Sequence, residues 1–331
     1  MSAGQESSVY NAVHSDEWDT MTREERVNVC KISDDQADAM STADLLQAVL
    51  ENPFLIDLYA FDIYREGFEH VYSQFPELKQ LVERRDFGAA LIDCYNSVPV
   101  VDNASCNSKD VYDSLYILSL LEILITQPEV TNNLKSEQLD SLISIAQEKY
   151  AAKQNMATVY GGSLETFYRG LYETDDSSIA RAARAMVTTP NGSNVVVIDN
   201  SFITDWTPAE RAQLNAQTEM AYPNATRLRD ASKKYNCHSY AWYSTSAANR
   251  YWINDPSVYM TDGSYVQTGS SAVGNKVYWK SGSSPVHSGI LALNSVGSPW
   301  ISCNSKWGQL GLYNHALEDC PYSGQRTYWT R

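Results

Sequence analysis

Apolar residues recur at three- and four-residue spacing through the first half of the chain, which predicts a series of amphipathic helices. Ser41 is placed to cap the first of them, and Pro53 is placed to end or bend it. Further helices are expected at 56–73, 76–82, 87–95, 110–125 and 136–153. No strand-like alternation occurs before residue 190, so we expect this half to be an α-helical domain.

The pattern changes after a turn signal near residue 190. A β-branched run at 194–199 predicts a strand. The segment Thr207-Pro208-Ala209-Glu210 predicts the capped start of a helix that reaches about Tyr222. Further strands are expected at 276–280, 288–293 and 300–303.

These patterns divide the chain into three expected parts and predict the α+β fold class. The first part, 1–40, reads as a polar and loosely held lead-in with one short helix around 23–30. The α-helical domain follows at 41–185, and a mixed domain with most of the strands follows at 190–331. The boundary is expected between about residues 176 and 192.

Charge and composition restrict the partners. The chain has 40 acidic and 25 basic side chains and a net charge of -15, which excludes nucleic acid and anionic membrane surfaces as main partners. No apolar run approaches the roughly 20 residues of a membrane span.

The first residues carry no pattern of a signal peptide. The 22 Tyr, 8 Trp and few Lys favour a secreted or cell-surface mature protein, with a cytoplasmic location as the alternative.

The six cysteines include no C-x-x-C pair, so a zinc ribbon is not expected, and no metal or cofactor is required. In an oxidising compartment, Cys94 with Cys106 or Cys303 with Cys320 could close a short loop. The alternative is that most of them are small buried hydrophobic residues.

Cys237 is the candidate nucleophile. It opens a predicted helix after two lysines, Lys233 and Lys234, and the positive potential and free backbone N–H groups there would favour a thiolate. The same N–H groups could form an oxyanion hole. The alternative is a buried structural cysteine. His238 follows directly and should point elsewhere on a helix.

His287 is the candidate base, because it stands at the start of a later apolar strand from which its imidazole could take the thiol proton. His315 is the rival base or a substrate contact. A third polar group should orient the imidazole, and the candidates are Ser302, Asn304 and Ser305. An amide oxygen orients imidazole well, which favours Asn304. Alternation would put Ser302 and Asn304 on one face of their strand and Cys303 and Ser305 on the other.

At these residues the chain resembles the NlpC/P60 superfamily of papain-like cysteine peptidases and amidases. Gly274-Asn275-Lys276-Val277 stands where that family has a Gly-Asp strand, and His287-Ser288-Gly289-Ile290 stands at its histidine strand. The resemblance covers roughly the last hundred residues. It implies an antiparallel sheet, a helix that carries the cysteine, and Cys237 and His287 as nucleophile and base. Asn236-Cys237-His238-Ser239 departs from the family's Asp-Cys-Ser-Gly, and the third catalytic position has no clear match.

Aromatic residues lie between these elements and could wall a cleft that stacks on sugar rings or clamps a peptide. The candidates are Trp242, Tyr243, Trp252 and Tyr278, together with His315. The alternative is that they fill the core.

The sequence therefore predicts a hydrolase of amide bonds in peptide or peptidoglycan-like substrates. The alternatives are an acyl transferase or glutamine deamidase on the same fold, or a secreted binding protein with an inactive papain-like domain.

Overall fold

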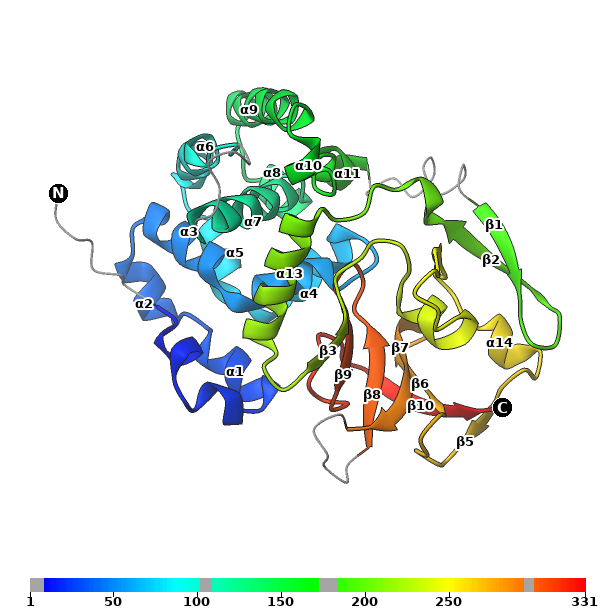
Figure 1. Cartoon of the computed structure of the whole chain (residues 1–331). Helices are drawn as coiled ribbons and strands as arrows, with labels where there is room; N and C mark the ends of the chain where they lie inside the picture. Colours follow the sequence, from blue (N-terminus) through cyan, green and yellow to red (C-terminus); the bar gives the residue numbers. More distant parts are fainter. Residues whose placement is uncertain (1–8, 102–108, 173–183, 295–300) are drawn as a thin grey trace.

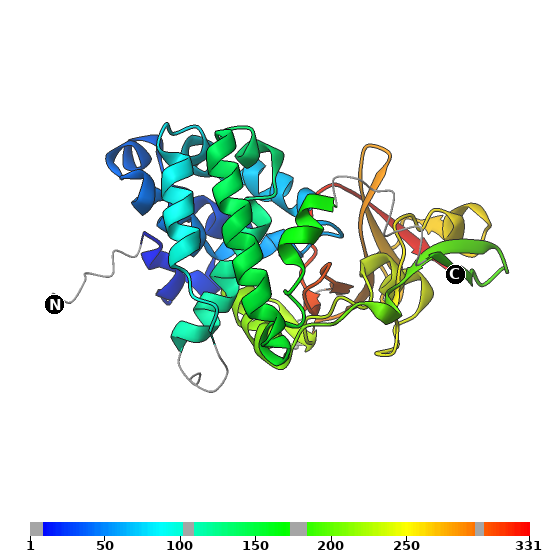
Figure 2. The same ribbon diagram turned by 90° about the horizontal axis from the view of Figure 1, so that it is seen from above.

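The computed structural model describes residues 9–101, 109–172, 184–294 and 301–331. The chain is a mixed structure, 47% helical and 18% strand, with antiparallel sheets, and the α+β prediction is confirmed. Figure 1 shows the helices of the first half gathered at one side and the strands at the other. Figure 2 shows the same division from a second direction.

The described helices of the first half include those predicted near residues 23, 41, 76, 87, 110 and 136, and also short ones at 34–39, 128–131, 157–160 and 166–172 that were not predicted. They are α1 (Arg23–Val29), α2 (Asp34–Ala39), α3 (Thr42–Glu51), α4 (Tyr64–Gln74), α5 (Pro76–Val82), α6 (Phe87–Ser97), α7 (Lys109–Leu124), α8 (Pro128–Thr131), α9 (Ser136–Gln154), α10 (Ala157–Tyr160) and α11 (Thr166–Tyr172). Ser41 caps α3 by accepting from the backbone N–H of Asp44, as predicted. Within the described residues, no helix is both long and apolar enough to cross a membrane.

The helix expected at 56–73 is instead two elements. The 3-10 helix η3 (Pro53–Tyr59) begins at a proline and is capped by Asn52, and α4 begins only at Tyr64. The 3-10 geometry and the bends after it interrupt the helical ladder, although the apolar spacing continues across them. The connection at residues 60–63 is brought against the C-terminal half of the chain, as shown below.

The strands form two sheets. A three-stranded sheet contains β1 (Arg184–Thr188), β2 (Asn194–Asp199) and β4 (Tyr251–Trp252). The seven-stranded antiparallel sheet has the order β3 (Thr226–Arg229), β9 (Leu312–His315), β8 (Ile301–Lys306), β7 (Ser284–Leu293), β6 (Lys276–Ser281), β10 (Gln325–Thr330) and β5 (Val266–Thr268). The strands predicted near 194, 276, 288 and 301 are present.

The expectation of no strand before residue 190 is wrong, because β1 begins at Arg184 and pairs with β2 as a hairpin. β1 is an edge strand in which only Val187 is buried, while Met186 is exposed. Its sequence therefore lacks the clear alternation of apolar and polar residues that would predict a strand. The predicted helix at 207 is α13 (Pro208–Ala221), and its capping box between Thr207 and Glu210 is present.

The lead-in is not loosely held over its described residues. Tyr10, Trp18, Cys30 and Ile32 are buried in the main core, and Trp18 donates its indole N–H to the carbonyl of Met220 at 2.8 Å. The polar composition misled the prediction because these few apolar side chains are spaced among charged residues that remain on the surface.

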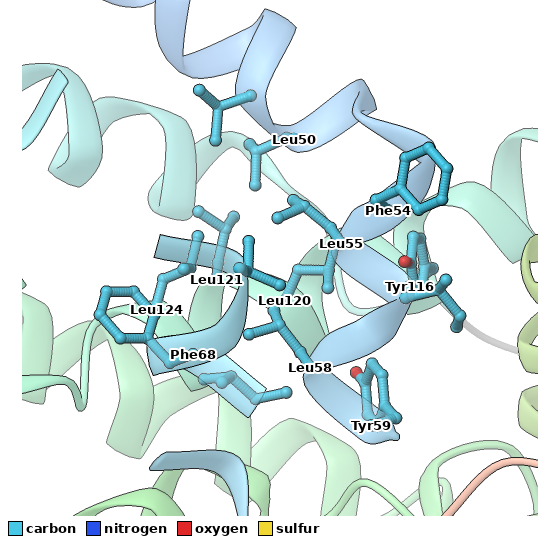
Figure 3. Packing of buried hydrophobic residues seen from close by; sticks show 14 of the residues in the cluster. Leu50, Phe54, Leu55, Leu58, Tyr59, Phe68, Tyr116, Leu120, Leu121 and Leu124 are labelled. Carbon is cyan, nitrogen blue, oxygen red and sulfur yellow. The ribbon is translucent and has the colours of Figure 1, made fainter. Parts of the chain in front are cut away.

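One hydrophobic cluster runs through the helices and into the second half of the chain. Figure 3 shows its helical part, where side chains of α3, η3, α4 and α7 interlock. The same cluster includes Trp206, Tyr222, Trp307 and Tyr322 from the expected second domain. Figure 1 accordingly shows α13 lying between the helices and the seven-stranded sheet. The independence of the two predicted domains stays a prediction.

The tightest point of this junction is Gly308. Its φ is +45°, and a Cβ added there would overlap the carbonyl group of Ala60, in the connection between η3 and α4. Gln309, next to it, donates its backbone N–H to the carbonyl of Tyr59 at 2.8 Å. The two halves of the chain therefore meet backbone to backbone here.

We expect Gly308→Ala to destabilise the protein by about 2–4 kcal/mol, because the left-handed backbone and the overlap with Ala60 both oppose a side chain. Gly282→Ala is the matched control, since its φ is +60° and nothing lies within 4 Å of the added Cβ. It should cost only about 1–2 kcal/mol. Urea unfolding of both variants measures the difference, and equal losses would contradict the close approach.

Candidate active site

The turn that carries the candidate nucleophile is held by the fully buried side chain of Asn236. Its Oδ1 accepts from the backbone N–H groups of Ser239 at 3.1 Å and Ile253 at 3.2 Å, and its Nδ2 donates to the carbonyl of Ile253 at 2.9 Å and to Asp62 Oδ2 at 2.8 Å. Asn236 thus caps the helix that follows. That helix covers residues 237–243 and ends as the π-helical segment η6 (Ser239–Tyr243), so the predicted helix start at Cys237 is confirmed.

The residue Cys237 is 3% exposed. Burial is the largest cause that raises its pKa well above the ordinary value, and the nearby Asp62 carboxyl adds to it. The backbone amides of Ser288 and His238 and the ammonium group of Lys306 act in the opposite direction and lower this pKa. All three favour the thiolate, but they do not offset the burial. Cys237 is a neutral thiol in this arrangement.

Ser288 lies against the cysteine helix at the point where two strands separate. β7 and β8 pair from Ile290 with Asn304 to Leu293 with Ile301, and Ser288 lies beyond the end of this ladder. Its Oγ lies 2.8 Å from His238 Nδ1 and accepts from the indole N–H of Trp242 at 2.8 Å, so Ser288 faces the cysteine helix.

His287 faces the other side of the same strand. Its imidazole stacks on the ring of Tyr322, with centroids 3.6 Å apart and planes 11° from parallel, and it also contacts Trp279. It is fully buried, and neither ring nitrogen has a hydrogen-bond partner among the described residues. Burial first, then His315 and His238, hold its pKa well below the ordinary value. Within the described structure no hydrogen bond joins Cys237 and His287.

The alternation predicted along β8 is present. The amide of Asn314 donates to Asn304 Oδ1 at 2.6 Å and to Ser302 Oγ at 2.7 Å, whereas Ser305 Oγ lies on the other face, 2.7 Å from His315 Nε2. The structure therefore groups Ser305 with the rival base His315. It does not join Asn304 to His287.

The predicted cleft aromatics lie mostly in the interior. Trp242, Trp252, Tyr278 and His315 are buried, and only Tyr243 is exposed, at 41%. Trp252 donates its indole N–H to the carbonyl of Lys233 at 3.0 Å, and Trp242 packs on the ring of Tyr265. The core-filling alternative describes these four positions in this structure.

Two charged groups beside the thiol were missed by the sequence analysis. Lys306, fully buried, donates its ammonium protons to the carbonyls of Ser232, Gly308 and Leu310, and burial lowers its pKa to about 7. Asp62, half-buried in the η3–α4 connection, has its pKa raised to about 7, first by burial and then by Glu66. No local pattern could have placed Asp62 here, because it lies 174 residues before its partner Asn236.

The remaining cysteines do not form the predicted short bridge. Cys303 and Cys320 are both free and buried, so the disulfide alternative for this pair is wrong and the alternative of small buried side chains holds. Cys94 is also a free thiol, and its predicted partner Cys106 lies outside the described residues. Among the described residues, no three His, Cys, Asp or Glu side chains gather as a metal site.

A small cavity of about 20 Å³ lies near the junction, lined by residues that include Tyr59, Tyr116, Trp206 and Glu210. It has room for about one water molecule and not for a peptide.

Comparisons with family models, curated proteins and solved structures find no match for this chain.

We expect the stability of the protein to depend on pH through Asp62. Its pKa is about 7 in the folded chain and 3.8 as the ordinary value, so between these pH values the folded chain holds a proton that the unfolded chain has lost. The free energy of unfolding should therefore fall as pH rises from 4 to 7. Between pH 5 and 7.5, the free energy of unfolding should fall by about 1 kcal/mol more in wild type than in Asp62→Asn. This figure is reduced because Asp62 is partly accessible to solvent.

Urea unfolding of wild type and Asp62→Asn at both pH values checks this expectation. Glu69→Gln is the control, because Glu69 is an exposed carboxylate on α4 that pairs with Arg65 at the surface. An identical pH dependence in wild type and Asp62→Asn would show that Asp62 titrates normally.

Proposed function

We propose that the chain is a cysteine hydrolase of amide bonds, with Cys237 as nucleophile and His287 as base. One observation carries the proposal. The side chain of Ser288 in β7 bonds to the cysteine helix at His238 and Trp242, and the residue next to Ser288 in the strand is a histidine. That histidine is buried with both ring nitrogens unpartnered among the described residues.

The unpartnered imidazole is the second support. Leaving a buried polar group without a hydrogen bond costs about 1–3 kcal/mol, and such groups in native proteins are often kept for chemistry. The ring rests on Tyr322 by stacking alone. Within the described structure the ring has no hydrogen bond to lose, but it lies on the face of β7 opposite to Ser288, so the proposal requires this part of the strand to move before the ring meets the thiol.

The reaction would begin when the imidazole takes the proton of the Cys237 thiol. The thiolate attacks the carbonyl carbon of the substrate, and the free backbone N–H groups at the start of the cysteine helix would donate to the developing oxyanion. The imidazolium then gives its proton to the leaving amine, which leaves a thioester on Cys237. His287 then takes a proton from water as the water oxygen attacks the thioester carbonyl, the C–S bond breaks, and the proton passes from His287 to the Cys237 sulfur as the acid product leaves.

The order of elements supports a papain-like domain of the NlpC/P60 kind. A helix carrying the cysteine is followed by β6, which begins just after Gly274, then by β7 with His287, then by β8. We propose peptide or peptidoglycan-like substrates and a secreted or cell-surface location. An acyl transferase or glutamine deamidase would use the same two residues and differ only in the group that accepts the acyl chain.

A second candidate function is a secreted binding protein whose papain-like domain is inactive. The observation that favours it is the 3% exposure of Cys237 together with its raised pKa, since a reactive cysteine is normally a partly exposed thiolate. In addition, Asn304, the predicted third catalytic residue, accepts its side-chain hydrogen bond from Asn314 and does not orient His287.

A brief iodoacetamide pulse followed by mass spectrometry tests the proposal in wild type and His287→Ala. We expect alkylation of Cys237 to slow by about tenfold or more in His287→Ala, because the base that generates the thiolate is lost. His315→Ala is the matched control for the rival base. Hydrolysis of muropeptides and ammonia release from glutamine peptides, measured with Cys237→Ser and Cys303→Ser, then separate the activities.

The proposal requires that Cys237→Ser abolish turnover while the equally buried Cys303→Ser retains it. A Cys237 alkylation rate that is unchanged by His287→Ala would remove the Cys–His pair and leave the binding-protein function.

A further inference from the structure

Lys276, the first residue of β6, has an ammonium group without a polar partner in the described structure. The residue is half-buried, and its ammonium group makes no hydrogen bond or ion pair with any described residue. Burial lowers its pKa to about 8, so the amine has lost part of its hydration. An ammonium group that gives up water normally gains hydrogen-bond acceptors in exchange.

The buried lysines of the described chain all make this exchange. Each donates to a backbone carbonyl or to a carboxylate, and they are Lys149, Lys153, Lys233 and Lys306. The half-buried Lys234 likewise donates to two carbonyls. Acceptors are not scarce, because the chain has 40 acidic side chains. The ammonium group of Lys276 is therefore available to a group from outside the chain.

Strand pairing places Lys276 on the face of the seven-stranded sheet that meets the cysteine helix. It lies directly opposite Ile290 of β7, and Ser288 lies on the same face two residues earlier. Ser288 bonds to His238 and Trp242 of the cysteine helix. One strand across and two residues along correspond to roughly 8 Å between Lys276 and Ser288.

Aromatic rings hold the ammonium group on this face. Lys276 Nζ is 5.7 Å from the centroid of the Tyr265 ring, and that ring packs edge-on against Trp242 with centroids 5.2 Å apart. Trp329 of β10 lies opposite Lys276 on the other side. The face of a ring attracts a cation, but it leaves the N–H groups free for other acceptors. Tyr265 is also half-buried, so solvent reaches this position.

We propose that Lys276 is a subsite for a carboxylate group of the substrate. A carboxylate matches a single ammonium group in charge and accepts hydrogen bonds from it. The inference rests on the proposed role of Cys237 as the nucleophile and narrows the substrate class. The substrate carries a free carboxylate about two or three residues from the scissile amide, because an extended residue spans about 3.4 Å. Such a carboxylate is a peptide C terminus or an acidic side chain.

Binding of three short peptides to Cys237→Ser tests the subsite without turnover. The probes are acetyl-Ala-Ala with a free C terminus, its C-terminal amide, and acetyl-Ala-Glu amide, which carries its carboxylate on a side chain. We expect at least one carboxylate probe to bind about tenfold more tightly than the neutral amide in ligand-observed NMR titrations. The net charge of -15 disfavours anions in general, so this preference requires a specific cation. The preferred probe identifies the source of the carboxylate.

Substitutions in the same background show whether Lys276 is that cation. Lys276→Met should bind the carboxylate probes no more tightly than the neutral amide, whereas Lys276→Arg should keep the preference because it keeps the charge. Lys280→Met is the matched control. Lys280 is half-buried on the same strand, but it pairs with Pro285 near the hairpin end. It should keep the preference, and the affinity for the neutral amide should be the same in all variants.

A carboxylate preference that survives in Lys276→Met would overturn the subsite, and so would the absence of any preference in Cys237→Ser. These outcomes are distinct from a failure of the proposed function. Alkylation of Cys237 that depends on His287, without a carboxylate preference, would leave the hydrolase and remove the subsite. A preference that depends on Lys276, without a Cys–His pair, would leave a carboxylate site and remove the hydrolase.

Discussion

The backbone contact between Gly308 and Ala60 is the constraint on which the arrangement of the site depends. It is possible only because residue 308 has no side chain and adopts φ +45°. The contact fixes the η3–α4 connection against the strand end that carries Lys306, and from there Asp62 reaches Asn236. The helical half is thereby part of the chemical environment of the cysteine and not only a neighbouring scaffold.

Asp62 and Lys306 both lie at this junction, and burial is the largest influence on the pKa of each. In the part of the chain that the structure describes, no carboxylate is bonded to Lys306, and three backbone carbonyls accept hydrogen bonds from its amine instead. Asp62 takes one amide hydrogen bond and shares its surroundings with Glu66. Each group is shifted toward its neutral form by burial, which is the response expected when desolvation exceeds the compensating attraction. A site of this kind responds strongly to small movements.

Local signals in the sequence predicted the elements well and the site only in part. Caps at Ser41 and Thr207, the start of the cysteine helix and the two faces of β8 follow from short-range patterns, and all are present. The orientation of His287 depends on which face of β7 meets the helix, and Tyr322, which holds it, lies far along the chain. Asp62 could not be found from spacing, because tertiary packing alone brings it to Cys237. The packed lead-in was missed for the same reason.

Arg26 and Asp319 form a buried ion pair between α1 and the segment after β9, 293 residues apart in the sequence. Arg26 is fully buried, so its charge requires this partner. Asp319 is synthesised 293 residues after Arg26. Until Asp319 has been made, α1 carries an uncompensated cation that cannot be stably buried, so the lead-in closes onto the core only after that point.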